Sequence, residues 1–137
     1  MTKLQPLQLD DRTFFVNLLS LLTHKVEQTA ELDRPLGDTG STLRDTLLFQ
    51  KRMYGINDKR LIEKELPYIA IPFWNTFWQL HETRQITAAG TFQPITFQEI
   101  EAYSRLMQVD FEPYEVDIVK RMDRSFITKL NTTKDKQ

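Results

Sequence analysis

The segment FWNTFWQLHETR, residues 73–84, constrains the fold more than any other stretch, because it places four aromatic side chains within six positions. At the 100° step of an α-helix, Phe73 and Phe77 share one face, while Trp74 and Trp78 lie on the adjoining face. The resulting apolar arc is roughly 160° wide or more, which is broader than the stripe of an ordinary surface helix. Such a helix needs neighbours on two sides, and a partner protein could supply one of them.

The composition favours one domain with a real core. The chain has 137 residues, of which 40% are hydrophobic, 11% aromatic and 27% charged, and these values are typical of a soluble globular protein. The formal net charge is −1, so there is no global electrostatic attraction to nucleic acid or to an acidic membrane. We expect partners of neither class.

Cysteine is absent, and the amino-terminal residues are polar. The lack of cysteine excludes disulfides, thiolate metal sites and cysteine catalysis, and it favours a reducing compartment. Residues 1–12 contain no apolar signal-peptide region. The longest mostly apolar run, residues 14–22, is too short to span a bilayer. We therefore expect a cytoplasmic globular protein.

Apolar residues at three- and four-residue steps predict an all-α fold, a single compact domain of about five helices. The expected helices cover about 11–31, 43–54, 67–84, 97–107 and 113–128. A short strand at TFFV, residues 13–16, is the alternative within the first helix. The third helix either begins at Pro67 with a bend or begins properly at Pro72, because proline is tolerated only in a first turn.

The clearest linker is DRPLGDTG, residues 33–40, which holds one proline and two of the four glycines. Residues 131–137 are polar and rich in charge, so we expect a frayed end. The expected organisation is an N-terminal helix and linker (1–36), a helical core domain (41–128) and a polar tail (129–137).

Cap residues mark several helix boundaries. Ser41 or Thr42 caps the second helix, and Gly55 ends it, since glycine adopts the left-handed conformation cheaply. Thr96 and Glu99 fit a reciprocal capping box at the start of the fourth helix. The residues expected to face the core are Leu43, Leu47, Leu48 and Tyr54 in the second helix, Ile100, Tyr103, Leu106 and Met107 in the fourth, and Val116, Val119, Met122 and Phe126 in the fifth.

No pattern in the sequence indicates catalysis or a cofactor. His24 and His81 lie on different predicted helices, with no acidic residue at a metal-ligand spacing. We interpret His81 as an amphipathic residue at the edge of the core. No serine lies in a nucleophile elbow, and no glycine loop fits a phosphate. We therefore expect no catalytic residue, no metal and no cofactor.

The helices on either side of residues 109–112 have the outline of a DNA-binding helix-turn-helix. Charge argues against this interpretation. From Thr96 to Thr128 there are four basic and seven acidic residues, which gives 4 − 7 = −3. Acidic residues crowd the amino end of the would-be recognition helix, where they suit the helix dipole but repel phosphates. A small DNA-binding regulator is therefore the last of three functional hypotheses, and the other two are given below.

Four segments in this order, with these approximate gaps, resemble a known family: STLRDTL (41–47), WNTFWQLHETR (74–84), PITFQEIEAYSRL (94–106) and EPYEVDIVKRMDRSF (112–126). The chain resembles the tail assembly chaperones of long-tailed bacteriophages over about residues 41–128. Glu112 departs from the family pattern, which has a capping threonine there. The matching positions are Trp74, Phe77, Leu80, Arg84, Pro94, Ile95, Thr96, Glu99, Ile100, Ala102, Leu106, Pro113, Tyr114, Glu115, Val116, Met122, Asp123 and Phe126.

The resemblance implies a non-enzymatic role in the cytoplasm of an infected host. Tail assembly chaperones are thought to bind the long helical tape-measure protein and keep it soluble until tail-tube subunits polymerise around it. A tape-measure protein or another tail protein is therefore the expected partner. The second hypothesis is a structural tail completion or connector protein of the virion. Purified virions would contain a connector but not a chaperone.

The central aromatic helix supplies the expected partner-binding site. We expect its surface to include Phe73, Trp74, Phe77, Trp78, His81 and Arg84, although each aromatic residue is individually typical of a core position. Arg84 is expected to close the helix end, where the dipole favours a cation. The first helix is apolar nearly all round, so residues 11–31 either complete the core or mediate homo-oligomerisation.

Overall fold

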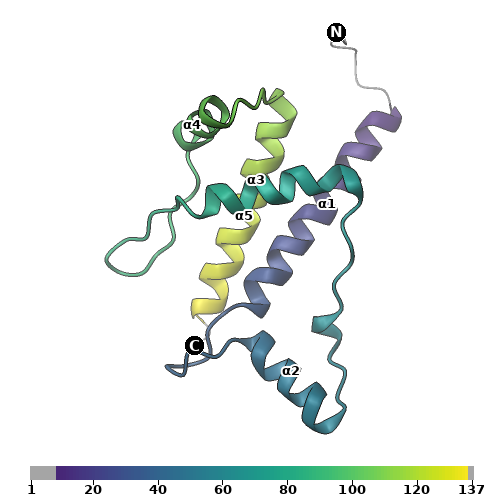
Figure 1. Cartoon of the computed structure of the whole chain (residues 1–137), viewed down its shortest axis with the longest axis vertical. Coiled ribbons are helices and arrows are strands. Elements are labelled where there is room, and N and C mark those ends of the chain that lie inside the picture. The colour runs from purple at the N-terminus through teal and green to yellow at the C-terminus, as the bar shows by residue number, and fades with distance from the viewer. Residues whose placement is uncertain (1–8, 136–137) are drawn as a thin grey trace.

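The computed structural model describes residues 9–135 and confirms the all-α fold (Figure 1). Within these residues no strand forms, and two isolated bridges, Pro35 with Thr42 and Ile86 with Phe92, close two loops. Residues 13–16 are helical. The elements are α1 (Leu9–Leu32), α2 (Leu43–Tyr54), the 3₁₀ turns η1 (Lys59–Leu61) and η2 (Tyr68–Ala70), α3 (Ile71–His81), α4 (Phe97–Met107) and α5 (Pro113–Asp135).

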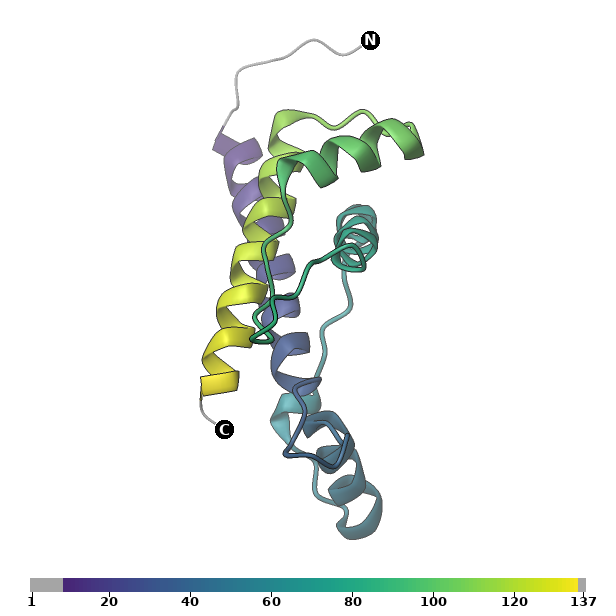
Figure 2. The ribbon, with the colours of Figure 1, turned by 90° about the vertical axis from the view of Figure 1, so that its left-hand side faces the viewer.

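The first and last helices, α1 and α5, make the most extensive packing contact of the fold. They run side by side in the same direction, and α3 crosses them on one side (Figures 1 and 2). α4 lies at the end where α5 begins, whereas α2 lies beyond the other end, where α1 finishes. Two parallel helices need a long connection, and here α2, α3 and α4 all belong to it.

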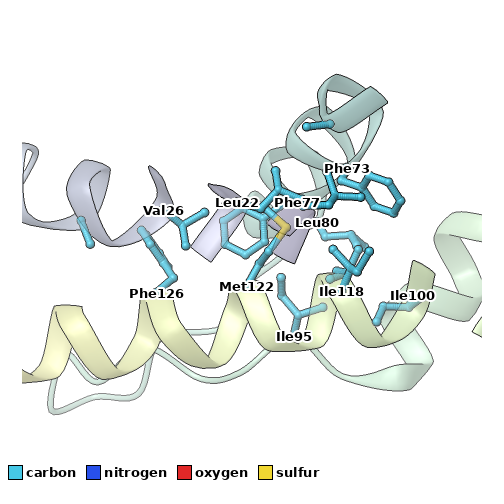
Figure 3. Close-up of a cluster of buried hydrophobic side chains, with 14 residues drawn as sticks. Leu22, Val26, Phe73, Phe77, Leu80, Ile95, Ile100, Ile118, Met122 and Phe126 are labelled. Carbon is cyan, nitrogen blue, oxygen red and sulfur yellow. The ribbon is translucent and has the colours of Figure 1, made fainter. Parts of the chain in front are cut away.

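The main core fills the space between α1, α3 and α5 (Figure 3). The inner face of α1 packs into this core. Completing the core was one of the two roles predicted for that helix. Val119, Met122 and Phe126 are buried as predicted, while Val116 is only partly buried. The buried residues are Leu18, Leu22, Val26, Ala30, Ala70, Phe73, Phe77, Leu80, Ile95, Ile100, Ile118, Val119, Met122 and Phe126.

A second, smaller cluster holds the segment that we call the α2 lobe, residues 33–63. Only Leu43 and Leu47 are buried within the lobe, and they cluster with Leu32 at the end of α1, with Leu36 and Leu61 packed against them. Polar contacts add to this small core: Arg44 pairs with the carboxylates of Asp33 at 3.0 Å and Glu63 at 2.6 Å. The lobe therefore depends on few apolar contacts and on ion pairs at its surface.

The predicted caps of α2 are present, and Thr42 rather than Ser41 is the N-cap. The Thr42 hydroxyl accepts from the Asp45 amide at 3.2 Å, and the Asp45 carboxylate accepts from the Thr42 amide at 2.9 Å. Gly55 ends the helix with φ 68°, a left-handed conformation that is inexpensive for glycine. Local sequence thus sets both ends of α2.

The α3 region resolves the question of which proline begins the helix. Pro67 precedes the short turn η2, and the α-helix starts at Ile71 with Pro72 in its first turn. The helix ends at His81, so the predicted end near Arg84 is wrong. Arg84 lies in the following loop, where its side chain turns into the protein and does not cap the helix end.

Several other expectations need correction. Leu48 and Tyr54 in α2, and Leu106 and Met107 in α4, are exposed, because each helix packs on only one narrow face. α5 continues to Asp135, past its predicted end at residue 128, so residues 131–135 are helical. The reciprocal capping box predicted at the start of α4 is only half present. The Thr96 hydroxyl accepts from the Glu99 amide at 3.2 Å. The Glu99 carboxylate, however, accepts from the Thr83 hydroxyl and makes no hydrogen bond to the Thr96 amide.

Candidate partner-binding site

The structure divides the aromatic belt of α3 into two halves. Phe73 and Phe77 are buried, with exposed fractions of 8% and 0%, and Phe77 packs edge-on against Phe126 at a centroid distance of 5.5 Å. Trp74 and Trp78 are only partly buried. The protein's own core therefore buries the phenylalanine side of the arc and covers its tryptophan side only in part.

The two tryptophans have different surroundings. Their rings meet edge-on at 5.4 Å. The ammonium of Lys25 lies 5.4 Å from the Trp74 ring, a distance that suits a cation–π contact. Trp78 instead packs against Phe126 at 5.4 Å and His81 at 5.2 Å. Trp78 thus belongs to an aromatic wall, whereas Trp74 lies beside a cation of α1.

This aromatic wall borders a pocket of about 450 Å³. Residues from the end of α1, the loop after α1, α3, the loop after α3 and the last turns of α5 surround it. Its apolar lining includes Pro35, Trp78, Phe92, Phe126 and Leu130. Its volume lies within the range of about 300–1,000 Å³ that is usual for ligand-binding clefts.

A buried ion pair fixes the loop that forms one side of the pocket. The guanidinium of Arg84 binds the carboxylate of Asp123, and both side chains are 2% exposed. Arg84 also donates to the carbonyl of Gln93 at 2.8 Å, while Asp123 accepts from the amide of Ile95 at 2.9 Å. The pair therefore ties the loop of residues 82–96 to α5, with its charges satisfied by additional hydrogen bonds.

Arg84 also sets the state of His81. Its Nε donates to His81 Nδ1 at 3.0 Å, which places the proton of the neutral ring on Nε2. Burial lowers the pKa of His81, and the nearby charge of Arg84 lowers it further. The imidazole is therefore neutral at pH 7, with Nδ1 as an acceptor and Nε2–H as a donor.

The six residues predicted to bind a partner fall into two groups. Phe73, Phe77 and Arg84 are buried and form part of the core or of the Arg84–Asp123 pair. Trp74, Trp78 and His81 are partly exposed, and the last two border the pocket. Partner contact stays a prediction for this site, and the second group is the one that reaches the surface.

Sequence reasoning did not find the rest of the pocket. Arg34 and Pro35 belong to a segment interpreted only as a linker, and Phe92 belongs to a loop with no helical period. One indication in the sequence is that Arg84 and Asp123 both match positions of the family pattern. Nothing in the sequence shows that their side chains are in contact.

Other kinds of site find no support in residues 9–135. No group of three or more histidine or acidic side chains there is arranged to hold a metal ion. No helix in the same range is long and apolar enough to cross a membrane. Aromatic side chains are enriched in the binding hot spots of protein interfaces, and a groove between helices is one kind of surface that accepts an amphipathic helix.

A family model described as phage tail assembly chaperone matches residues 51–128, which is more than half of the 137-residue chain. The chain therefore belongs to the phage tail assembly chaperone family, as the resemblance indicated. No curated protein and no solved structure matches it. The matched segment contains α3, α4 and the Arg84–Asp123 pair, whereas α1 lies outside it and still completes the core.

Proposed function

We propose that this protein binds the helical tape-measure protein in the cytoplasm of the infected host and keeps it soluble during tail assembly, without catalysing a reaction. The observation that carries the proposal is the position of Trp78 and His81, partly exposed on the wall of an apolar pocket. Membership of the tail assembly chaperone family supports a tail protein as the partner.

The physics of helix recognition fits this role. An amphipathic helix presents apolar side chains at i, i+3, i+4 and i+7, and a groove between helices accepts them. Tryptophan supplies a large contact area at low entropic cost, so Trp74 and Trp78 suit a binding surface. A net charge of −1 gives little long-range attraction, which suits a complex that must later release its client.

Co-expression with the tape-measure protein of the same phage tests the proposal. We expect Trp74→Ala together with Trp78→Ala to reduce the soluble, co-purifying client several-fold. Tyr68→Ala is the matched control, because Tyr68 is an aromatic side chain 90% exposed outside the pocket. Circular dichroism verifies that each variant folds. The proposal is wrong if the folded double variant keeps as much client soluble as the wild type.

A structural tail completion or connector protein is the second candidate. The exposed apolar side chains on α2, which include Leu48, Phe49 and Met53 at 44%, 46% and 58% exposure, would suit permanent contacts in a virion. Mass spectrometry of purified virions separates the two functions. A connector is present at a fixed stoichiometry, whereas a chaperone is absent.

Homo-oligomerisation through residues 11–31 also stays a proposal. The inner face of α1 is occupied by the core, so the apolar side chains that remain for a second copy include Phe14 and Val16, at 50% and 59% exposure, on different sides of the helix. Light scattering of the wild type beside the Phe14→Ser, Val16→Ser variant tests it. A monomeric wild type would contradict this mode of association.

A further inference from the structure

Arg34, at the edge of the pocket, has a side-chain N–H group that makes no hydrogen bond to the described residues. It follows α1 directly, and its backbone is held there, since its carbonyl accepts from the Leu43 amide at 3.1 Å. Its side-chain Nε is buried, yet it has no hydrogen-bond partner among the described residues. Buried donors are paired in the great majority of cases, and leaving a charged one unpaired is expensive. An acceptor from outside the chain would remove this penalty.

The acidic side chains close to Arg34 in sequence are already engaged. Asp33 pairs with Arg44 at 3.0 Å, and Glu31 pairs with Lys129 at 2.9 Å. Arg34 exerts only a longer-range influence on Glu31, whose pKa is lowered first by the hydrogen bond from Lys129. Neither of these two neighbouring carboxylates therefore hydrogen-bonds to Arg34.

A second donor borders the same pocket. His81 accepts from Arg84 through Nδ1, so its Nε2 carries the proton and is the remaining donor of this partly exposed ring. The apolar side chains of Trp78, Phe126 and Leu130 line the same pocket, together with Thr29, Asp33 and Asn131. The pocket thus combines a largely apolar lining with one buried donor that lacks an acceptor and a second donor on a partly exposed ring.

We infer that this pocket binds a segment of the client protein that inserts a large apolar side chain and places a neighbouring carboxylate on Arg34, with His81 as a second donor. The apolar walls select the side chain, and the cation selects an acidic neighbour over a neutral or basic one. That the segment comes from a client protein rests on the proposed function. Arg34 is then the residue that gives the site its specificity for acidic segments.

The test uses the full chain labelled with ¹⁵N and two small probes, N-acetyl-L-phenylalanine and its amide, which differ only in the carboxylate. We expect the carboxylate probe to shift the indole N–H signal of Trp78 and the Nε–H signal of Arg34, and to bind about fivefold or more tighter than the amide. Arg34→Gln removes this preference but retains apolar binding. Arg52→Gln is the matched control, since Arg52 is an exposed arginine of α2 away from the pocket.

Equal binding of the two probes, no shift by either probe, or an unchanged preference in Arg34→Gln would overturn the inference. Light scattering tests which protein supplies the bound segment. If the wild type forms a concentration-dependent dimer that Arg34→Gln abolishes, the segment comes from a second copy of this chain, which contradicts binding of a client.

The proposed function and this inference can fail separately. If the tryptophan variants release the client while the probes show no preference, this inference alone is wrong. If the preference holds but the tryptophan variants retain the client, the proposed function alone is wrong.

Discussion

The main core and the α2 lobe differ in how they are held together. Fourteen buried residues from α1, α3, α4, α5 and the adjoining segments form the main core, whereas three buried leucines hold the lobe. The lobe also depends on surface contacts, such as the bond from Arg44 to Glu63 at 2.6 Å. Regions with few buried apolar contacts open at lower free energy than the global unfolding. The lobe is therefore the part of the molecule that we expect to open first, and the core the part that defines the fold.

Removing the central ring of the core should have the largest effect. Phe77→Ala leaves a cavity between α1, α3 and α5 and should lower the free energy of unfolding by about 3–5 kcal/mol. Urea unfolding followed by circular dichroism measures this loss. Phe49→Ala, at an exposed position of α2, should change stability by less than about 0.5 kcal/mol. Similar losses from both variants would contradict the assignment of the core.

Breaking the buried ion pair should cost nearly as much. Asp123→Ala leaves the Arg84 charge without its partner and the Ile95 amide without an acceptor, so we expect a loss of about 3–5 kcal/mol in urea unfolding. Asp117→Ala is the control, since Asp117 pairs with Arg121 at the surface at 3.0 Å. A loss below about 1 kcal/mol for Asp123→Ala would show that the pair is not essential for stability.

Leu47→Ala tests whether the lobe opens separately. The side chain is 2% exposed, and its truncation should cost about 2–4 kcal/mol. Because the lobe has its own cluster, hydrogen exchange should accelerate in α2 while the amides of α1 and α5 stay protected. Equal acceleration in all three helices would mean that the molecule opens as one unit.

The capping residues give a finer comparison. Thr42→Ala removes one bond of a reciprocal capping box and should cost about 1 kcal/mol, while fraying α2. Thr96→Ala removes the bond from the Glu99 amide at 3.2 Å and a long contact of 3.4 Å to the Glu99 carboxylate. No reciprocal bond to the backbone holds this cap in place, so its cost should be smaller. Thermal unfolding and α2 amide exchange measure both, and a larger effect at Thr96 would reverse this order.

The smallest expected effect is a dependence of stability on pH through His81. Burial lowers its pKa in the folded protein below the ordinary value of 6.5. The unfolded chain therefore binds the proton more readily, so this contribution to stability is present above pH 6.5 and is lost as the pH falls. Urea midpoints should decrease between pH 7.5 and 5.5. His81→Asn should weaken this decrease, whereas His24→Asn at an exposed position should not.

Local features were predictable from the sequence because their causes are local. Cap residues and prolines act on adjacent backbone, so Gly55 as the end of α2 followed from one residue, while the start of α2 was narrowed to Ser41 or Thr42 and that of α3 to Pro67 or Pro72. Periodicity also identified most of the buried face of α5. It could not show which helices pair, and for this reason Leu106 and Met107 were expected inside although no helix covers them. The same limit hid the pocket, which Trp78, Phe92 and Leu130 form from three separate segments.

The pairing of the first helix with the last has a consequence for biosynthesis. Leu22 and Val26 of α1 are covered by Met122 and Phe126 of α5 (Figure 3), and the ribosome makes α5 long after α1. At a synthesis rate of about 5–20 residues per second, translation from the end of α1 to Phe126 takes on the order of 5–20 s. During that interval α1 carries an uncovered apolar face. The growing chain therefore exposes an apolar helix of its own until α5 has been made.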